Sequence, residues 1–396
     1  MQIIPNGIIL IGIIPDGKIN IADMNSPFKF GNEVTDPFFV NRKEEIRRLQ
    51  NNFRSGNNTV LISPRRWGKS SLVNQSALLT KDRNTRFAFI NIQSFRNEEN
   101  FYQSYCLEVL KSTITRKEEF LEAGRNFFKK LVPRLSFSID PYHDLSVSFD
   151  WQEAKKAKDE ILNLPETIAR KKNIRIVVCM DEFQNIIKID ESESILQELR
   201  SVWIKHQNVS YCLYGSKRHM MLDIFNKESK PFYRFGDLIL LKKIDREHWI
   251  QYIIAAFERT NKKINAGEAD FIAGTANDHP YYVQQLAHEV WNSTVKTAGR
   301  EIVRECIDRV IDTNTIFYQE STDNLSNTQI NLLIAVGTGI KQLTSAEAIS
   351  KFKIGTLNNI RKNKSILEQK DILDFHAGDS MFVDPFFEFW FRRNFL

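Results

Sequence analysis

One segment of the chain constrains the fold more than any other. The β-branched run Thr59-Val60-Leu61-Ile62 leads into Ser63-Pro64-Arg65-Arg66-Trp67-Gly68-Lys69-Ser70-Ser71, and a helical pattern continues to Leu79. The loop matches the phosphate-binding pattern G-x-x-x-x-G-K-[ST], except that Ser63 replaces the first glycine. A strand that enters the loop and a helix that leaves it are the context that this pattern requires. The segment therefore predicts a phosphate site at the edge of an α/β sheet.

The residue types in this loop suit ATP bound with Mg²⁺. Gly68 lets the backbone approach the phosphates closely, and successive N–H groups at the start of the helix face the anion. Lys69 supplies a compact positive charge for the β- and γ-phosphates, and the Ser70 hydroxyl can bind Mg²⁺. We expect the whole loop, from Ser63 to Ser71, to contact the nucleotide.

An acidic pair at the end of a buried strand is the second half of the predicted site. Asp181 and Glu182 follow the apolar run Ile176-Val177-Val178-Cys179-Met180. Carboxylates in that position are costly unless they are paired or functional. Asp181 stands where a Walker B carboxylate holds Mg²⁺, and Glu182 can orient and deprotonate the attacking water. The alternative is a solvated acidic pair at a strand end. The presence of the phosphate loop in the same chain makes that interpretation the weaker one.

Three more polar residues are weaker candidates. Ser216 follows a strand and can contact the γ-phosphate or the lytic water, but an ordinary turn serine is an equal alternative. Gln184 can orient the same water, with the same alternative. Arg234 can bind the γ-phosphate in cis or across a subunit boundary, because its planar fork binds phosphate bidentately. The alternative for Arg234 is a solvent-facing salt bridge.

The first half of the chain alternates strand and helix patterns. Strands are predicted near residues 59–62, 87–92, 174–180, 209–214 and 238–241. Because helical segments separate them, the fold class is α/β with a mostly parallel sheet. A strand between the loop and the acidic strand is typical of P-loop enzymes with an added strand and a catalytic glutamate. An insertion at residues 100–165 contains a β-hairpin near 135–149, which is a surface loop or a protein contact.

The second half divides into two parts. After Ile244 the pattern is wholly helical, and from Leu325 three short helices precede a two-stranded hairpin and an aromatic tail, which is the order of a winged helix. We predict an N-terminal extension (1–25), a P-loop ATPase core (26–244), a helical lid (245–324) and a winged-helix domain (325–396). The aromatic tail must be largely buried.

Composition excludes several classes. The net charge of +6 is a mild excess for 396 residues, so it permits an acidic partner without requiring one. The four cysteines and seven histidines show no disulfide or zinc spacing, which predicts no structural metal and fits a reducing cytoplasm. The apolar stretch 7–14 is far shorter than the about 20 residues that span a bilayer. We expect no membrane association and no signal peptide.

Together these motifs resemble the archaeal and bacterial ATPase family of the AAA+/STAND-like P-loop proteins, which is related to origin-recognition ATPases. The resemblance covers residues 26–396. Besides the loop and Asp181-Glu182-Phe183-Gln184, it rests on Phe39-Val40-Asn41-Arg42, Gly215-Ser216, Phe232-Tyr233-Arg234, His279-Pro280-Tyr281-Tyr282 and Asp384-Pro385-Phe386 with Trp390. It implies that Phe39, Val40 and Arg42 lie near the adenine. It also implies that His279 and Pro280 are a nucleotide sensor. Asn41 replaces the glycine of the family's F-x-G-R motif, and Ser63 replaces the first glycine of the phosphate loop.

Several uses of ATP remain open. The chain is an ATPase switch or motor with a regulated protein partner or self-association, an ATP-dependent binder of duplex DNA, or a nucleotide-binding scaffold without turnover. DNA contacts would come from a predicted recognition helix that carries Asn358, Asn359, Arg361, Lys362 and Lys364. Residues 325–396 have nine basic and seven acidic side chains, a net charge of only +2. This favours a protein-packing role for the winged helix.

Overall fold

The structure is a computed structural model that describes residues 25–113, 136–139, 145–148, 150–376 and 379–396. Two compact units make up these residues. The sheet unit comprises Phe30–Trp249 and Ala273–Val283, and the helical unit comprises the segment ending at Lys29 with Ile250–Ile272 and Gln284–Leu396. The division passes through three helices, α10 (Arg246–Arg259), α11 (Ala266–Thr275) and α12 (Pro280–Ser293). The predicted domain boundaries at residues 244 and 324 stay predictions.

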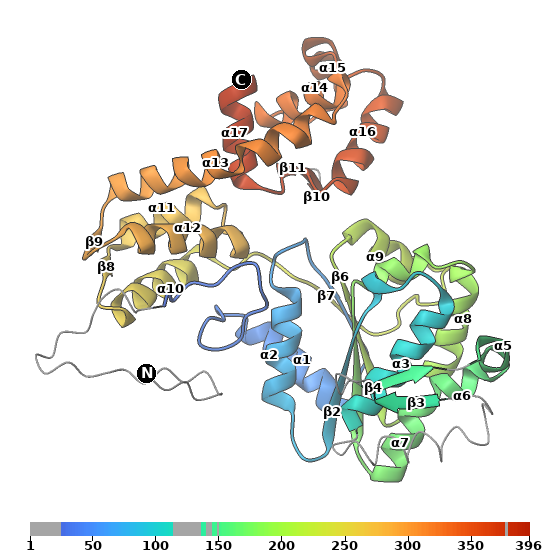
Figure 1. The fold of residues 1–396 in the computed structure, drawn as a ribbon. Helices are drawn as coiled ribbons and strands as arrows, with labels where there is room; N and C mark the ends of the chain where they lie inside the picture. The colour runs from blue at the N-terminus through green and yellow to red at the C-terminus, as the bar shows by residue number, and fades with distance from the viewer. Residues whose placement is uncertain (1–24, 114–135, 140–144, 149, 377–378) are drawn as a thin grey trace, which may run out of the picture. The chain divides into compact units, whose positions relative to one another are not determined.

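A five-stranded parallel sheet forms the centre of the sheet unit (Figure 1). Its strands lie in the order β2-β5-β6-β1-β7. Their bounds are Thr59–Ile62 for β1, Thr85–Asn91 for β2, Arg175–Asp181 for β5, Val209–Gly215 for β6 and Asp237–Leu240 for β7. Each predicted strand is present, and the α/β class is confirmed.

The strand order brings three loops to one point. Strand β6 lies between β1 and β5, with Ile62 opposite Gly215 and Met180 opposite Leu213. Because all three strands are parallel, their carboxyl ends meet at the same edge of the sheet. The phosphate loop after β1, Ser216 after β6 and Asp181 at the end of β5 therefore lie side by side.

Alternating side chains of the central strands supply two hydrophobic cores. Leu61, Val177, Cys179, Cys212 and Tyr214 pack on one face, beneath α1 (Lys43–Ser55) and α2 (Lys69–Thr80). Their neighbours along each strand pack on the other face, against α3 (Glu98–Thr113), α6 (Lys158–Leu162), α7 (Leu164–Lys172), α8 (Ser192–Trp203) and α9 (Arg218–Phe225). Strands buried on both faces are typical of a parallel sheet covered by helices. Figure 1 shows these helix layers on the two sides of the sheet.

The helices of the sheet unit follow the predicted pattern. They are α1 (Lys43–Ser55), α2 (Lys69–Thr80), α3 (Glu98–Thr113), α5 (Trp151–Ala154), α6 (Lys158–Leu162), α7 (Leu164–Lys172), α8 (Ser192–Trp203) and α9 (Arg218–Phe225), with short 3₁₀ turns η2 (Ile92–Ser94), η3 (Lys155–Ala157) and η4 (Phe183–Lys188). The predicted hairpin in the insertion is confirmed as the antiparallel pair β3 (Ser136–Ile139) and β4 (Leu145–Ser148). Residues 114–135 of the insertion, and the N-terminal extension up to residue 24, lie outside the described residues.

The helical unit contains most of α10, α11 and α12 with the long α13 (Arg300–Asp323). The prediction that this region is wholly helical was wrong in one detail. Two-residue strands β8 (Lys263–Ile264) and β9 (Thr297–Ala298) pair in parallel, because the connections before α11 and α13 run beside each other. Among the described residues, no helix is both long enough and apolar enough to cross a membrane.

The winged helix is present in the predicted order: α14 (Asn327–Gly337), α15 (Ala346–Phe352), α16 (Leu357–Gln369), the hairpin β10 (Leu373–His376) with β11 (Asp379–Phe382), and α17 (Pro385–Phe395). Local chemistry sets the helix starts. Ser326 forms a capping box with Gln329, and the Ser345 and Thr356 side chains accept backbone N–H groups. Asp384 caps α17, whose Phe386, Phe387, Trp390 and Phe391 are buried as predicted.

Candidate active site

The phosphate loop is a curved backbone between β1 and α2. Arg66 and Gly68 both have left-handed backbone conformations, with φ of 62° and 85°. Alternation of right- and left-handed residues turns successive N–H groups to the same side, which favours an anion. Glycine adopts the second angle without strain. Ser63 is buried, and its hydroxyl donates to Pro64 O at 3.0 Å, so a small polar residue is accommodated where the pattern has glycine.

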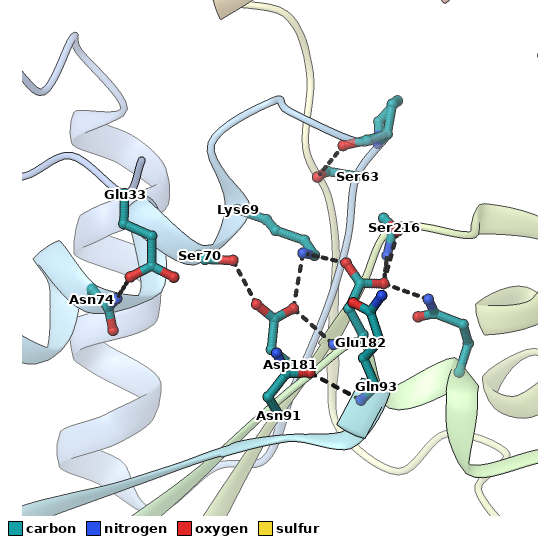
Figure 2. A network of polar contacts seen from close by, with 12 residues as sticks. Glu33, Ser63, Lys69, Ser70, Asn74, Asn91, Gln93, Asp181, Glu182 and Ser216 are labelled. Carbon is teal, nitrogen blue, oxygen red and sulfur yellow. Dashed lines mark hydrogen bonds and ion pairs between the residues drawn. The ribbon is translucent and has the colours of Figure 1, made fainter. Parts of the chain in front are cut away.

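Lys69, the first residue of α2, lies between the two predicted acids (Figure 2). Its Nζ is 2.8 Å from Asp181 Oδ1 and 2.7 Å from Glu182 Oε1. The three side chains are 12%, 18% and 14% exposed, so the charges are largely shielded from water but open to a ligand. The structure therefore brings together the ammonium and both carboxylates that the sequence predicts for one site.

Ser70 and Asp181 form the candidate metal position. The Ser70 hydroxyl donates to Asp181 Oδ2 at 2.6 Å, and Asp181 Oδ1 accepts the backbone N–H of Glu182 at 2.7 Å. A hydroxyl and a carboxylate that already converge fit Mg²⁺, which takes oxygen ligands and retains several waters. No group of three or more histidine, cysteine or acidic residues gathers elsewhere in the described part of the chain to suggest another metal.

Glu182 is the most constrained member of the cluster. Its backbone is left-handed, with φ of 51°, which is uncommon for a residue with a side chain. While Oε1 pairs with Lys69, Oε2 accepts Ser216 Oγ at 2.8 Å and Gln184 Nε2 at 2.5 Å. Figure 2 shows Ser216 and Lys69 on this carboxylate from different elements. Ser216 thus lies within the site.

The ion pairs and hydrogen bonds of the site favour the charged forms of Glu182 and Lys69. Burial raises the pKa of Glu182, but Lys69 and the hydrogen bonds from Gln184 and Ser216 outweigh that effect, so the pKa lies below its ordinary value. Burial lowers the pKa of Lys69, and the charges of Asp181 and Glu182 outweigh it, so the pKa is raised. The site therefore holds a charged Lys69 beside a charged Glu182 at neutral pH.

The predicted adenine segment borders the loop. Val40 is buried, and Phe39 and Trp67 pack on the same hydrophobic core between the sheet and α1 and α2. Arg42 is buried with its Nη1 donating to Lys242 O at 2.5 Å and to Glu45 at 3.2 Å. Its guanidinium therefore holds the chain between β7 and α10, while Phe39 and Val40 remain beside the loop.

The predicted sensor also reaches the phosphate loop. The His279 ring lies edge-on to Trp67, with centroids 6.1 Å apart, and 4.6 Å from Tyr282. Pro280 begins α12 directly after it. Burial, with smaller contributions from Arg66 and Lys243, lowers the pKa of His279 to about 3. His279 is therefore a neutral imidazole at the edge of the candidate nucleotide site.

Two predicted residues have other surroundings. The Ser71 hydroxyl accepts Val34 N at 3.0 Å, so it holds the segment that leads to Phe39. The structure does not bring Arg234 to the phosphate loop. Arg234 precedes β7 and is two residues before Gly236, which lies against the backbone of Asn58 at the amino end of β1. That end is opposite the loop in a parallel sheet, so the geometry does not support contact in cis.

The sequence interpretation missed the role of two tyrosines. Arg66 Nη1 donates to Tyr282 Oη at 3.2 Å, and the Arg66 guanidinium lies 4.6 Å from the Tyr281 ring centre. Both tyrosines follow His279-Pro280 in the first turn of α12, but nothing in their type or spacing indicated an arginine partner in the loop.

Comparison with known proteins agrees with this geometry. Residues 39–286 match a family described as an ATPase domain predominantly from Archaea, and residues 316–393 match a winged helix domain. A search of curated proteins gives no match. The fold is similar to a Walker-type ATPase of Pyrococcus abyssi, with a TM-score of 0.62 and 16% identity over 94% of this chain and 100% of that one. It is also similar to the Aeropyrum pernix ORC2 protein in ADPNP–ADP complexes, with a TM-score of 0.57 and 12% identity over 92% and 96%.

Proposed function

Because the chain belongs to the ATPase family found predominantly in Archaea and carries a winged helix domain, we propose that ATP binding and hydrolysis switch its conformation and so regulate engagement of a partner. The observation that carries this proposal is the position of Lys69 Nζ, 2.8 Å from Asp181 and 2.7 Å from Glu182 at the start of α2. A polyphosphate competes with these carboxylates for the same ammonium group. Binding therefore changes the contacts of all three residues.

The phosphate chain of ATP lies along the loop in this proposal. Backbone N–H groups between Ser63 and Ser71 and the start of α2 face the phosphates. Lys69 contacts the β- and γ-phosphates, while Arg65 and Arg66 add positive charge at the loop's outer turn. Phe39 and Val40 supply apolar contacts for the adenine, and His279 and Pro280 close its edge.

Ser70 and Asp181 would hold Mg²⁺, which supplies neutralisation of the phosphate charge when it is bound. Glu182 then acts as the general base. As the water oxygen bonds to the γ-phosphorus, Glu182 takes one proton, and the bond to the β,γ-bridging oxygen breaks to release ADP. The Ser216 hydroxyl orients Glu182. Without a partner we expect slow turnover, since Arg234 lies away from the loop and can act only on a neighbouring subunit.

The switch would pass through α12. Arg66 and Trp67, at the tip of the loop, contact Tyr282 and His279. A phosphate that draws Arg66 away must alter the first turn of α12. Because α12 continues into the helical unit, a nucleotide that changes the contacts of its first turn can also change the affinity for a partner. The partner in this proposal is a protein or a second copy of the chain.

DNA binding through α16 is the second candidate function. Asn358, Asn359, Arg361 and Lys362 are exposed on that helix, as readout of duplex DNA requires. By contrast, the Lys364 ammonium lies 4.8 Å from the Phe375 ring centre. Because residues 325–396 also have a net charge of only +2, we place protein contact first.

One experiment separates these functions. ATP hydrolysis is measured with and without duplex DNA at low salt, and the size of the protein in solution is measured in ATP and in ADP. Turnover with a nucleotide-dependent change in size supports the switch. Salt-dependent DNA affinity that is lost in Arg361→Ala/Lys362→Ala supports the second candidate. ATP binding without turnover under every condition supports a scaffold and contradicts the proposal.

A further inference from the structure

The amide of Gln184 is buried between the candidate base and the end of β6. Gln184 lies in η4, directly after Glu182 and Phe183, and is 1% exposed. Its Nε2 donates to Glu182 Oε2 at 2.5 Å, while its Oε1 has no hydrogen-bond partner among the described residues. Burying an amide with one unpaired oxygen costs free energy. A feature with such a cost calls for a role beyond packing.

Strand β6 is shaped to admit this amide. A Cβ atom on Gly215 would lie 2.0 Å from Gln184 Oε1 and 2.8 Å from Met221 Sδ. Both distances are shorter than non-bonded atoms tolerate, so any side chain at position 215 displaces the amide. Gly215 immediately precedes Ser216, the other donor to Glu182. The end of β6 therefore builds both contacts to the same carboxylate.

The two oxygens of Glu182 have different surroundings. Oε2 accepts Gln184 Nε2, Ser216 Oγ at 2.8 Å and Ser216 N at 3.4 Å, all of them neutral donors. Oε1 contacts the Lys69 ammonium at 2.7 Å. Phosphates compete for Lys69 because it is charged, and they have no comparable attraction for the neutral donors. Nucleotide binding thus releases Oε1 and leaves Oε2 held.

We infer that Gln184 is a positioning residue that, with Ser216, fixes Oε2 of Glu182 so that Oε1 is the oxygen that takes the proton from the attacking water. This inference rests on the proposed function and adds to it the assignment of the basic oxygen. As one O–H bond of water breaks, its proton bonds to Oε1 and the water oxygen bonds to the γ-phosphorus. Gln184 keeps its own protons throughout.

The test uses the full chain with Gln184→Met, which keeps length and removes the amide. The control is Gln207→Met, an exposed glutamine before the amino end of β6. We expect kcat to fall by about ten- to a hundred-fold, as for loss of a hydrogen bond to a charged group. We also expect an ATP Kd within about two-fold of wild type, because Gln184 does not contact the phosphate loop. Gln207→Met should match wild type.

A double-mutant comparison separates this inference from the proposed function. Adding Gln184→Met to Glu182→Gln should cause no further loss, because the residue acts only through Glu182. An equal loss in both backgrounds, or an unchanged kcat in Gln184→Met, overturns the inference. Full turnover in Glu182→Gln itself would instead overturn the proposed catalytic base. If Gln184→Met does not fold, Ser216→Ala removes the other donor and must lower kcat in wild type but not in Glu182→Gln.

Discussion

The Arg66 guanidinium donates a hydrogen bond to the Tyr282 hydroxyl at 3.2 Å, so the tip of the phosphate loop contacts the first turn of α12. Arg66 also lies 4.6 Å from the Tyr281 ring centre. The same residue has a left-handed backbone, with φ of 62°. A change at the phosphates that moves Arg66 must therefore alter both the loop and the helix.

The first prediction concerns Tyr282→Phe. This change removes the hydroxyl that accepts from Arg66 and keeps the ring. We expect ATP-dependent protection of the α12 amides from hydrogen exchange to decrease, with a stability loss of about 1 kcal/mol. Tyr281→Phe is the control, because it keeps the ring beneath Arg66. Equal protection in wild type and Tyr282→Phe would show that the contact transmits nothing.

The second prediction concerns Lys69→Ala. Without the ammonium, ATP binding should fall below detection, because the loop loses its compact charge for the β- and γ-phosphates. The variant should also be less stable at neutral pH by about 3 kcal/mol, since Asp181 and Glu182 then repel each other without a partner. Nucleotide titration and urea unfolding measure the two effects.

The pH dependence of the Lys69 variant has a definite sign. In wild type the pKa of Glu182 is lowered on folding, so its stabilisation is present above the unfolded pKa and is lost as pH falls through the folded pKa. The stability deficit of Lys69→Ala should therefore shrink on acidification. A deficit that stays constant with pH would contradict the ion pairs as its cause.

The third prediction concerns Glu182→Gln. Glutamine has the same shape but cannot accept the water proton, so kcat should fall by about a hundred- to ten-thousand-fold. ATP affinity should be retained or increased, because one carboxylate no longer competes for Lys69. Asp181→Asn is the contrasting variant, and it should weaken the dependence of ATP binding on Mg²⁺. Radiolabelled phosphate release and equilibrium binding distinguish the two.

The sequence predicted the sheet and the loop because their signals are local. The run from Ile176 to Met180 is apolar at every position, which only a strand buried on both faces explains, and Lys69 and Ser70 follow a strand directly. The proximity of Ser216 depended on the strand order, since β6 had to lie between β1 and β5. The strand between the loop and the acidic pair in the sequence, β2, lies at the edge of the sheet beside β5, so no local pattern indicated this order.

Other features depended on contacts that no local pattern encodes. Ser71 is one residue beyond a candidate metal ligand, yet helix geometry turns its hydroxyl to Val34. Arg234 has the residue type for a phosphate contact, but it precedes β7 rather than following it, which places it at the opposite edge of the sheet. The room that Gly215 leaves for Gln184 likewise requires two segments that the fold alone brings together.

The last prediction concerns His279. Burial, with the charges of Arg66 and Lys243, lowers its pKa to about 3, whereas the unfolded value is 6.5. Below pH 6.5 the unfolded chain binds a proton that the folded chain does not, so His279 destabilises the fold progressively as pH falls toward 3. The slope from one such group is at most about 1.4 kcal/mol per pH unit. His279→Gln should flatten the loss of stability over this range.

His219→Gln is the matched control, because His219 is exposed. Urea unfolding at a series of pH values should give the same slope for wild type and His219→Gln and a shallower one for His279→Gln. Identical slopes in all three proteins would show that the His279 ring is hydrated and titrates normally.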